Sequence, residues 1–364
     1  MAGVKTKKAI KISLISLLSL IGVLLLVALG YLLYLVLDYS RIPDQLTISV
    51  TDNGIDESLI TGEEYTISTY NIGFGAYTRD FTFFMDGGKE SWAESPESVR
   101  WCIEGASDAI ENMGCDFILF QEVDTDSTRS YHINQADILT ERFSDYSSAF
   151  AVNYHSSFLA YPFTEPHGAS NAGILTLSKY DITSSVRRSL PISESLTKFL
   201  DLDRCYSKSY IPVEGGKNLV IYNVHLSAYG GSPEIRTAQM TMLFLDMKME
   251  YMQGNYCISG GDYNHDLLGN SLELLNGEAS ADFEWAQPLP TELLPDGIGV
   301  CGDYTDSLEP TCRNCDEPYE EGNFTIIVDG FIVSDNIEVT YLQNVNLGFE
   351  YSDHNPVEMK FILK

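Results

Sequence analysis

Residues 256–264 read YCISGGDYN. An apolar, β-branched run that ends in two glycines is typical of a buried strand followed by a tight turn. The turn supplies a carboxylate (Asp262) and an amide (Asn264), groups that are costly to bury without partners. Alone, such a sequence is most often only a turn, because both side chains hydrogen-bond their own backbone. If other predicted strands also end in polar residues, the pattern instead indicates a functional site.

Five further polar clusters lie in or beside apolar, strand-like runs. They are 70–73 (YNIG), 120–123 (FQEV), 223–226 (NVHL), 328–331 (VDGF) and 352–356 (SDHNP). Each cluster places a carboxylate, an amide or an imidazole near a strand end. If the strands lie side by side, these groups converge at one end of the sheets. Because six such coincidences are far less expected than one, we interpret the clusters as parts of a single site.

The rest of the body mixes strand-like and helix-like segments. Strands are predicted at 65–74, 116–123, 173–179, 218–226, 256–260, 325–333 and 356–363. Helices are predicted at 95–113, with Pro96 in the first turn and Gly114 as the C-terminal cap, and at 233–252. This mixture predicts a layered α/β architecture with mixed or antiparallel sheets. Residues 281–324, rich in acids and prolines, are predicted to be a long ordered loop or insertion.

The N-terminal segment differs from the body. Residues 1–11 hold four lysines and no acid, and residues 12–37 carry no charge. As a helix, that run measures roughly 39 Å, which exceeds a hydrocarbon layer of ~30 Å. The position of the lysines predicts a cytoplasmic N-terminus and an extracytoplasmic body at the cell membrane. We expect a basic tail (1–11), a single-pass signal anchor (12–37), a stalk with an edge strand (38–63) and one domain (64–364). The alternative is a signal peptide cleaved near Ala28-Leu29-Gly30.

The body is strongly acidic. Residues 38–364 hold 18 of the 22 basic residues against all 52 acidic residues, which leaves a net charge of −34. Tight binding of nucleic acid needs clustered Lys and Arg, so it is not expected here. A phosphate substrate approached through a metal ion is not excluded. The one adjacent basic pair in the body, Arg187-Arg188, is predicted to lie on the solvated surface.

Two further segments are ambiguous. The chain has seven cysteines, an odd number, in a compartment that permits disulfides. Cys312-x-x-Cys315 favours a local disulfide over a zinc site, since no second cysteine pair or histidine pair completes a zinc shell. The run 81–85 (FTFFM) is either a lipid-inserting loop or a buried plug.

In order and type, the six clusters resemble the signature of the endonuclease/exonuclease/phosphatase superfamily with the DNase I-like fold. The resemblance covers about residues 64–364, and residues 168–182, with Asn171 and Gly173, resemble the central strand of the family. It implies an α/β, DNase I-like four-layer sandwich of two mixed or antiparallel β-sheets flanked by helices, preceded here by one transmembrane helix. It also implies a membrane-anchored, bacterial-type member that hydrolyses phosphate esters with Mg²⁺ or Mn²⁺.

The resemblance implies a role for each matching residue. Three oxygen-bearing side chains would hold the metal: Asn71, Glu122 and Asp353. Five residues would carry catalysis: His225, Asp262, Asn264, Asp329 and His354. Asp262 would orient or deprotonate the attacking water, and Asn264 would hold a phosphate oxygen. His354 would pair with Asp329, while His225 would face the phosphate. An imidazole beside an aspartate keeps its proton more readily, which suits His354 as a donor to phosphate.

Two further residues are predicted to contact substrate, Asn171 and Arg313. Arg313 is the one cation in residues 281–324. It could clamp a substrate phosphate through a bidentate hydrogen bond. The alternative is that it only neutralises Asp316 and Glu317.

The resemblance does not choose the ester. A phosphodiester hydrolase is expected, either a DNase I-like nuclease or a sphingomyelinase or phospholipase C-type enzyme, since an anchored domain has lipid headgroups within reach. A protein of a different class, a catalytically silent surface module that binds a partner, is the alternative. The sequence gives no indication of the oligomeric state.

Overall fold

The computed structural model describes residues 2–193, 195, 198, 203–228, 232–277, 285, 287–305 and 308–364, with side chains from residue 7 onward. It divides into two compact units, Met1–Arg41 and Ile42–Lys364. The first unit consists of helix α1 (Ala2–Asp38). Its stretch Lys7–Asp38 is long and apolar enough to cross a membrane, and by length and composition alone a signal sequence would also fit.

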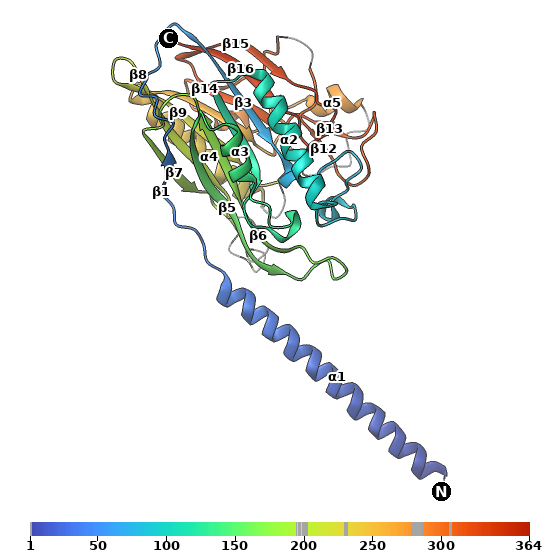
Figure 1. The fold of residues 1–364 in the computed structure, drawn as a ribbon. Helices are drawn as coiled ribbons and strands as arrows, with labels where there is room; N and C mark the ends of the chain where they lie inside the picture. The colour runs from blue at the N-terminus through green and yellow to red at the C-terminus, as the bar shows by residue number, and fades with distance from the viewer. Residues whose placement is uncertain are drawn as a thin grey trace. The chain divides into compact units, whose positions relative to one another are not determined.

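The second unit is built from two seven-stranded sheets (Figure 1). The first, called here the β10 sheet, has the order β1 (Leu46–Ile48), β7 (Ser184–Ser189), β8 (Cys205–Val213), β9 (Lys217–His225), β10 (Tyr256–Asp262), β14 (Asp329–Ser334), β11 (Ile298–Val300). The second, the β4 sheet, has the order β15 (Ile337–Asn344), β16 (Val357–Leu363), β3 (Glu64–Asn71), β4 (Phe117–Asp124), β6 (Gly168–Ser178), β5 (Ser147–Leu159), β2 (Val50–Thr51). A separate two-stranded ribbon joins β12 (Cys312–Arg313) to β13 (Thr325–Ile326).

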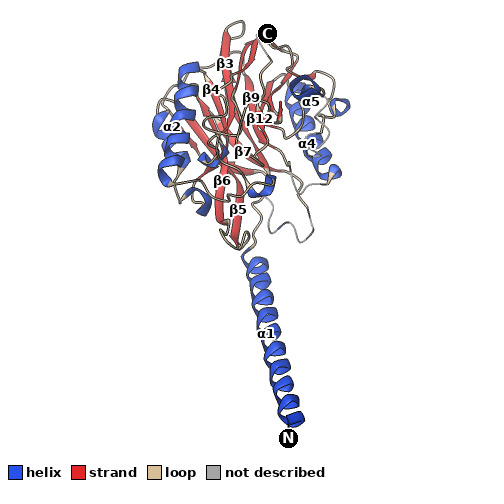
Figure 2. Ribbon diagram, turned by 90° about the vertical axis from the view of Figure 1, so that its right-hand side faces the viewer, coloured by secondary structure: helices blue, strands red, loops and turns tan. Residues whose placement is uncertain are grey.

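Helices cover the outer faces of both sheets. They are α2 (Pro96–Met113), α3 (Gln135–Arg142), α4 (Pro233–Met252) and α5 (Ser271–Asn276). Figure 2 shows α2 on one side of the strands and α4 and α5 on the other. Between the sheets lies a core that includes Ile67, Phe117, Ile221 and Ile258. The predicted α/β sandwich of two mixed sheets flanked by helices is confirmed, and the observed order is helix, sheet, sheet, helix.

Helix α2 shows why the local sequence gives this structure. The Ser95 side chain caps its first turn by accepting a hydrogen bond from Ser98 N at 3.0 Å, and Pro96 follows at the first helical position. Gly114 ends the helix with φ 67°, the left-handed conformation that glycine tolerates best. Its buried residues recur every three or four positions: Val99, Cys102, Ile103, Ala106, Ser107 and Ile110. The predicted helix at 95–113 is therefore confirmed at both ends.

Residues 42–63 belong to the compact body. β1 adds an edge strand to β7, and β2 adds one to β5. The domain therefore begins at Ile42, where we predicted a stalk. The predicted loop at 281–324 contains β11 and β12 in its described part, while residues 281–284, 286 and 306–307 lie outside the described residues.

Arg187 corrects the prediction of a solvated basic pair. Its side chain is 1% exposed. Nε donates to Val152 O at 2.7 Å and Nη2 to Asp203 O at 2.7 Å, while Nη1 reaches the carbonyl oxygens of Ile42 and Pro43, each at 3.4 Å. The planar guanidinium group of arginine can donate to several carbonyl oxygens at once. Arg187 therefore ties backbone segments together in the interior, an arrangement that we call the Arg187 clamp.

The predicted disulfide is also wrong, because all seven cysteines are free and buried. Cys312 pairs in register with Ile326 across the β12–β13 ribbon, and the Cys315 carbonyl accepts the amide of Phe83. Phe81 and Phe83 pack beside Cys315 in the core under α2. Of the two interpretations of residues 81–85, the buried plug is the one that the packing supports.

Candidate active site

The register of three strands brings three predicted residues together. β10 runs parallel to β9 and antiparallel to β14, so that Asp262 lies opposite His225 on one side and Asp329 on the other. His225 Nε2 is 3.5 Å from Asp262 Oδ2. The turn after β10 folds back, and Asn264 N donates to Asp262 Oδ1 at 2.8 Å. The neighbouring strands β9 and β14 therefore flank the Asp262 carboxylate on both sides.

Gly261 is required for this close approach. Its φ is +148°, and a Cβ there would lie 2.0 Å from the carbonyl oxygen of Val224 on β9. Residues with a side chain rarely adopt this conformation, and no room exists for one. The glycine pair in the sequence thus permits β9 and β10 to pair up to their last residues.

The β4 sheet contributes the facing groups. Asn71 ends β3 opposite Gln121 of β4, and Glu122 follows in a β-bulge with φ 55°. A bulge redirects the side chain that it carries. Asn71 Nδ2 donates to Asp262 Oδ2 at 3.1 Å and lies 3.4 Å from both Glu122 Oε1 and His354 Nε2. Asn71 therefore links the two sheets at the centre of the site.

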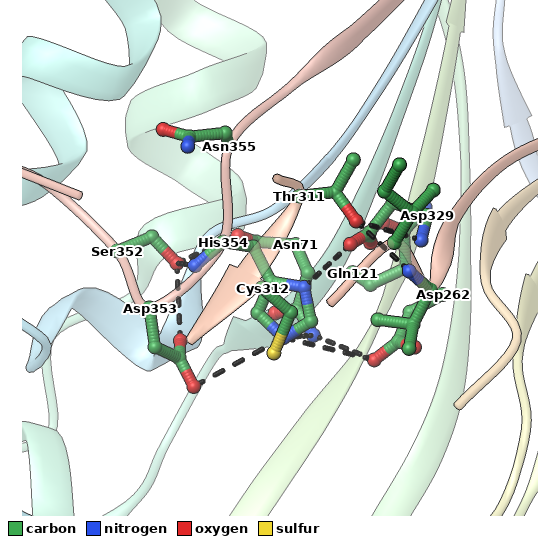
Figure 3. Close-up of polar contacts among 12 residues, drawn as sticks. Asn71, Gln121, Asp262, Thr311, Cys312, Asp329, Ser352, Asp353, His354 and Asn355 are labelled. Carbon is green, nitrogen blue, oxygen red and sulfur yellow. Dashed lines mark hydrogen bonds and ion pairs between the residues drawn. The ribbon is translucent and has the colours of Figure 1, made fainter. Parts of the chain in front are cut away.

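His354 is held by Asp329. The two are joined by Nδ1 and Oδ2 at 2.7 Å, and the Asp329 amide donates to Thr311 Oγ1 at 3.1 Å. His354 Nε2 lies 3.9 Å from Asp262 Oδ2 and 4.0 Å from Asp353 Oδ2. Figure 3 shows His354 and Asn71 between Asp262 on one side and Asp353 on the other.

These groups surround a cavity of about 250 Å³. Six of the predicted catalytic and metal residues line it: Glu122, His225, Asp262, Asn264, Asp353 and His354. Asn71 and Asp329 are fully buried and contact the lining residues directly. The six sequence clusters therefore meet in one place.

The two predicted substrate contacts differ in their placement. Arg313 lines the cavity. Asn171 does not line it, and its Oδ1 lies 2.6 Å from His155 Nδ1 instead. The next residue of β6, Ala172, is the one that lines the cavity, because successive side chains of a strand point to opposite faces. Asn171 is therefore no longer a candidate for substrate contact.

Burial separates the protonation states of the acids and imidazoles. Burial raises the pKa of Asp262 to about 6, and burial followed by the Glu122 carboxylate raises the pKa of Asp353 to about 6. Burial lowers the pKa of His225 well below its usual value. Burial also opposes the charge on His354, but its negative neighbours, Asp329 first and Asp353 further on, together outweigh burial and leave the pKa of His354 well above the usual value. The site thus pairs a neutral imidazole with a protonated one.

Sequence reasoning missed several lining residues, of which Arg129 is the clearest. Its guanidinium grips Asp124 at 2.9 and 3.1 Å and lies 3.8 Å from the Phe74 ring centroid. Its partner Asp124 comes two residues after Glu122, directly after the 120–123 cluster, so the sequence did show a further acid at this strand end. The pairing with Arg129, however, could be found only once the loop after β4 was folded. Asn153, Arg204 and His167 also line the cavity and lie in no cluster.

The donor set fits a hard divalent cation. Ligand atoms of Asp262, Asp329 and His354 lie within 4.8 Å of one another, but Asp329 Oδ2 is already bonded to His354. Glu122 and Asp353 line the cavity, whereas Asp329 does not, and burial raises the pKa of both lining acids. Buried carboxylates that resist ionisation gain most from an added positive charge. Cys312 also lines the cavity, yet burial raises the pKa of its thiol to about 12, so the sulfur stays protonated. Oxygen ligands of this kind suit Mg²⁺.

Two sheets with this order, flanked by helices and meeting at one acid–imidazole cavity, define the DNase I-like fold of endonuclease/exonuclease/phosphatase proteins. Among solved structures, the chain is similar to an endonuclease/exonuclease/phosphatase from Beutenbergia cavernae DSM 12333, with 15% identity, a TM-score of 0.55, and 82% of this chain and 72% of that chain covered.

A family protein from Leptotrichia buccalis C-1013-b gives 16% identity and a TM-score of 0.52, covering 82% of this chain and 99% of that chain. ANGEL2, a 2′,3′-cyclic phosphatase, gives 14% identity and a TM-score of 0.52, covering 89% of this chain and 99% of that chain. No model of a known protein family and no curated protein matches the sequence. At these identities the comparisons establish the fold.

Proposed function

We propose that the chain is a divalent-metal-dependent hydrolase of phosphate esters, with phosphodiesters as the expected substrates. The observation that carries the proposal is the convergence of Asp262, His225, the His354–Asp329 pair and Glu122 around one cavity. The fold supports it, because proteins named as phosphatases share it. We also propose that α1 anchors the domain in the cell membrane, with the domain outside the cytoplasm. The lysines before the apolar stretch support this side.

Glu122 and Asp353 would hold the cation, Mg²⁺ or Mn²⁺, with Asn71 beside Glu122. When bound, the ion would polarise the phosphoryl oxygens and offset the negative charge that develops during the reaction. The two carboxylates lie far apart in the sequence, Glu122 on β4 and Asp353 in the loop before β16, and these two strands belong to the same sheet, so folding brings both to the cavity.

Asp262 is placed to act on water. Donors fix its carboxylate, with Asn71 Nδ2 at 3.1 Å and Asn264 Nδ2 at 3.2 Å from Oδ2. A bond forms between the water oxygen and phosphorus while the bond from phosphorus to the leaving oxygen breaks. The water proton passes to Asp262, and the leaving oxygen takes up a proton from solvent water. Holding the water in line and in a fixed orientation is most of what such a reaction requires from protein groups.

The two imidazoles would serve the phosphate in different ways. His354, kept protonated by Asp329, presents Nε2 toward the cavity as a charged donor to a phosphate oxygen. His225 is neutral, so it can donate one N–H without adding charge. Fixed donors aimed at the developing oxyanion are a large source of rate enhancement.

An assay with bis-p-nitrophenyl phosphate tests the proposal. Wild-type protein should release p-nitrophenol with Mg²⁺ or Mn²⁺ and lose that activity in EDTA. Asp262→Asn should lower kcat by about 10²-fold or more with unchanged metal affinity. Near-normal turnover by this variant would end the assignment of Asp262. No activity with any divalent metal or any phosphate ester would favour the silent binding module.

A further inference from the structure

The part of the cavity that the proposed mechanism does not use is the wall formed by Arg313. The side chain is 2% exposed and lines the cavity. One terminal nitrogen, Nη2, donates to the carbonyl oxygens of Thr78 at 3.0 Å and Phe81 at 3.3 Å. The other donor nitrogens, Nε and Nη1, are buried and have no hydrogen-bond partner. The guanidinium is therefore fixed in place, while its Nε and Nη1 donors remain available to a ligand.

No ion pair joins Arg313 to a carboxylate within the described part of the chain. Direct pairing with Asp316 or Glu317, the alternative interpretation, is therefore not observed. Asp353, an acid of the proposed metal site, is joined to Arg313 through the backbone, since its carbonyl oxygen accepts the Arg313 amide at 3.0 Å. An arginine is always charged, and a buried charge with open donors is costly unless an anion completes it.

Arg313 is separated from three of the groups proposed to act at the reacting phosphate. Its hydrogen bonds lead to the 78–81 loop after β3, whereas Asn264, His225 and Asp262 lie together at the ends of β9 and β10. The fourth group, His354, is nearer, because it forms a β-bridge with Cys312, the residue before Arg313. Asn153 gives a second, independent sign of an unfilled site. Its side chain is 1% exposed, lines the cavity and has an Nδ2 without a partner. Both open groups are donors, so the missing ligand supplies acceptor oxygens.

The cavity also limits the size of this ligand. A volume of about 250 Å³ lies at the lower end of small-molecule sites. The chain carries a net charge of −30, whereas Arg129, Arg204 and Arg313 line the cavity, so positive charge is available to a ligand inside the cavity rather than along a surface track. A polymer strand needs such a track.

We propose that Arg313 forms a second anion subsite, so that the substrate is a small phosphate ester carrying a further phosphate or carboxylate group. This rests on the proposed function. The further group is bound by the open Nε and Nη1 donors, and the rest of the leaving group reaches Asn153. The same chemistry occurs in soluble bisphosphates and in phosphorylated lipid headgroups.

Matched substrate pairs test the proposal on the full chain. The diester pair is thymidine 5′-(p-nitrophenyl phosphate) with and without a 3′-phosphate, and the monoester pair is glucose 1,6-bisphosphate against glucose 1-phosphate. Vesicles of phosphatidylinositol 4-phosphate against phosphatidylinositol form the lipid arm. We expect kcat/KM to favour the doubly anionic member of at least one pair by about tenfold or more, mainly through KM. The pair that responds distinguishes a soluble source from a lipid source.

Arg313→Gln should bring the ratio of kcat/KM between the two members of that pair close to one, and Arg313→Lys should give a ratio between those of Arg313→Gln and wild type. Arg142→Gln is the matched control, because Arg142 is exposed on α3 and pairs with Asp108 and Glu111. It should keep the full preference. Equal kcat/KM for both members of every pair with wild-type protein would overturn the subsite. So would an Arg313→Gln variant that slows both members equally, because Arg313 would then hold the reacting phosphate.

A binding measurement keeps the subsite separate from the activity. In EDTA, calorimetry of the wild type should show glucose 1,6-bisphosphate binding about tenfold more tightly than glucose 1-phosphate. Equal affinities would overturn the subsite even if Arg313→Gln does not fold. Tighter binding of the bisphosphate without hydrolysis of any ester would support the subsite and reject the proposed function.

Discussion

At the residue scale, Asp329 is the group that sets the charge of His354. Burial disfavours the protonated imidazole, and the negative groups around it, led by the Asp329 carboxylate 2.7 Å away, together reverse that preference. Asp329→Asn removes the negative charge and keeps the shape, so the pKa of His354 should fall and the ring should be neutral at pH 7. We expect kcat to fall by about 10²-fold, with a smaller change in KM.

Steady-state kinetics and an NMR titration of His354 check this prediction together. Asp145→Asn, a change at an exposed aspartate, is the control and should alter neither quantity. An unchanged His354 titration in Asp329→Asn would show that the carboxylate does not hold the proton there.

His167 predicts how stability depends on pH. Burial, with Arg129 adding to it, lowers the pKa of His167 to about 3, against about 6.5 in an unfolded chain. Between these values the unfolded chain binds one more proton, so this contribution to stability is present above about pH 6.5 and is lost as pH falls. The loss is up to about 1.4 kcal/mol per pH unit.

Urea unfolding between pH 5 and pH 7.5 measures this effect. His167→Gln should flatten the pH dependence of the free energy of unfolding relative to wild type. If the free energy of unfolding depends on pH equally in wild type and His167→Gln, His167 takes up its proton in the folded state.

Among single residues, those that could be predicted share one property: they stand in a polar cluster at a strand end. Asp262, Glu122 and His354 were found in this way. Arg129 and Arg187 were missed or misjudged, because nothing in the local sequence tells a buried arginine from a solvated one. Their partners, Asp124 and the Val152 carbonyl, become neighbours only through the fold.

At the element scale, β9 and β10 set the site through their pairing. Gly261→Ala would place a Cβ 2.0 Å from Val224 O at a φ of +148°. We expect the free energy of unfolding to fall by about 2–4 kcal/mol. Activity should also fall, because His225 and Asp262 are the adjacent pair of this register.

Chemical unfolding and the ester assay measure the two effects. Gly299→Ala on β11 is the control, since nothing lies within 4 Å of its added Cβ. A Gly261→Ala variant with wild-type stability would show that the strands can separate at this point without cost.

Whole elements were predicted where local signals agree. Helix α2 carries a serine cap, a proline and a terminal glycine, and its limits followed from them. The strand β5 was not predicted, because its apolar run (residues 149–152) is short and most of the remaining residues of Ser147–Leu159 are polar. The bulge at Glu122 was beyond sequence reasoning as well, since it depends on the register between β4 and β6.

At the scale of the whole molecule, the two compact units predict independent behaviour. Deleting residues 1–41 should leave a body that folds, with the Tm and ester hydrolysis of the full chain, and should move it from the membrane fraction to the soluble fraction. Differential scanning calorimetry and fractionation check this. Retention of the shortened chain on membranes would place a second membrane contact in the body.

The free cysteines give a further whole-molecule prediction. All seven are buried, and burial raises the pKa of Cys102, Cys115 and Cys257 to about 12. Iodoacetamide should label none of the seven in the folded protein and all of them in urea, by intact mass. A chain that stays two or more labels short in urea would contain a disulfide.

If α1 anchors the domain as proposed, the Arg187 clamp has a mechanical consequence. Tension along the chain from α1 would reach Ile42 and Pro43 before it reaches β1. There the carbonyls are held by the guanidinium, and the Ile42 amide donates to Asp203 at 2.6 Å. The pull would then pass to Val152 on β5 and to Asp203 just before β8, and the short edge strand would be shielded from being peeled away.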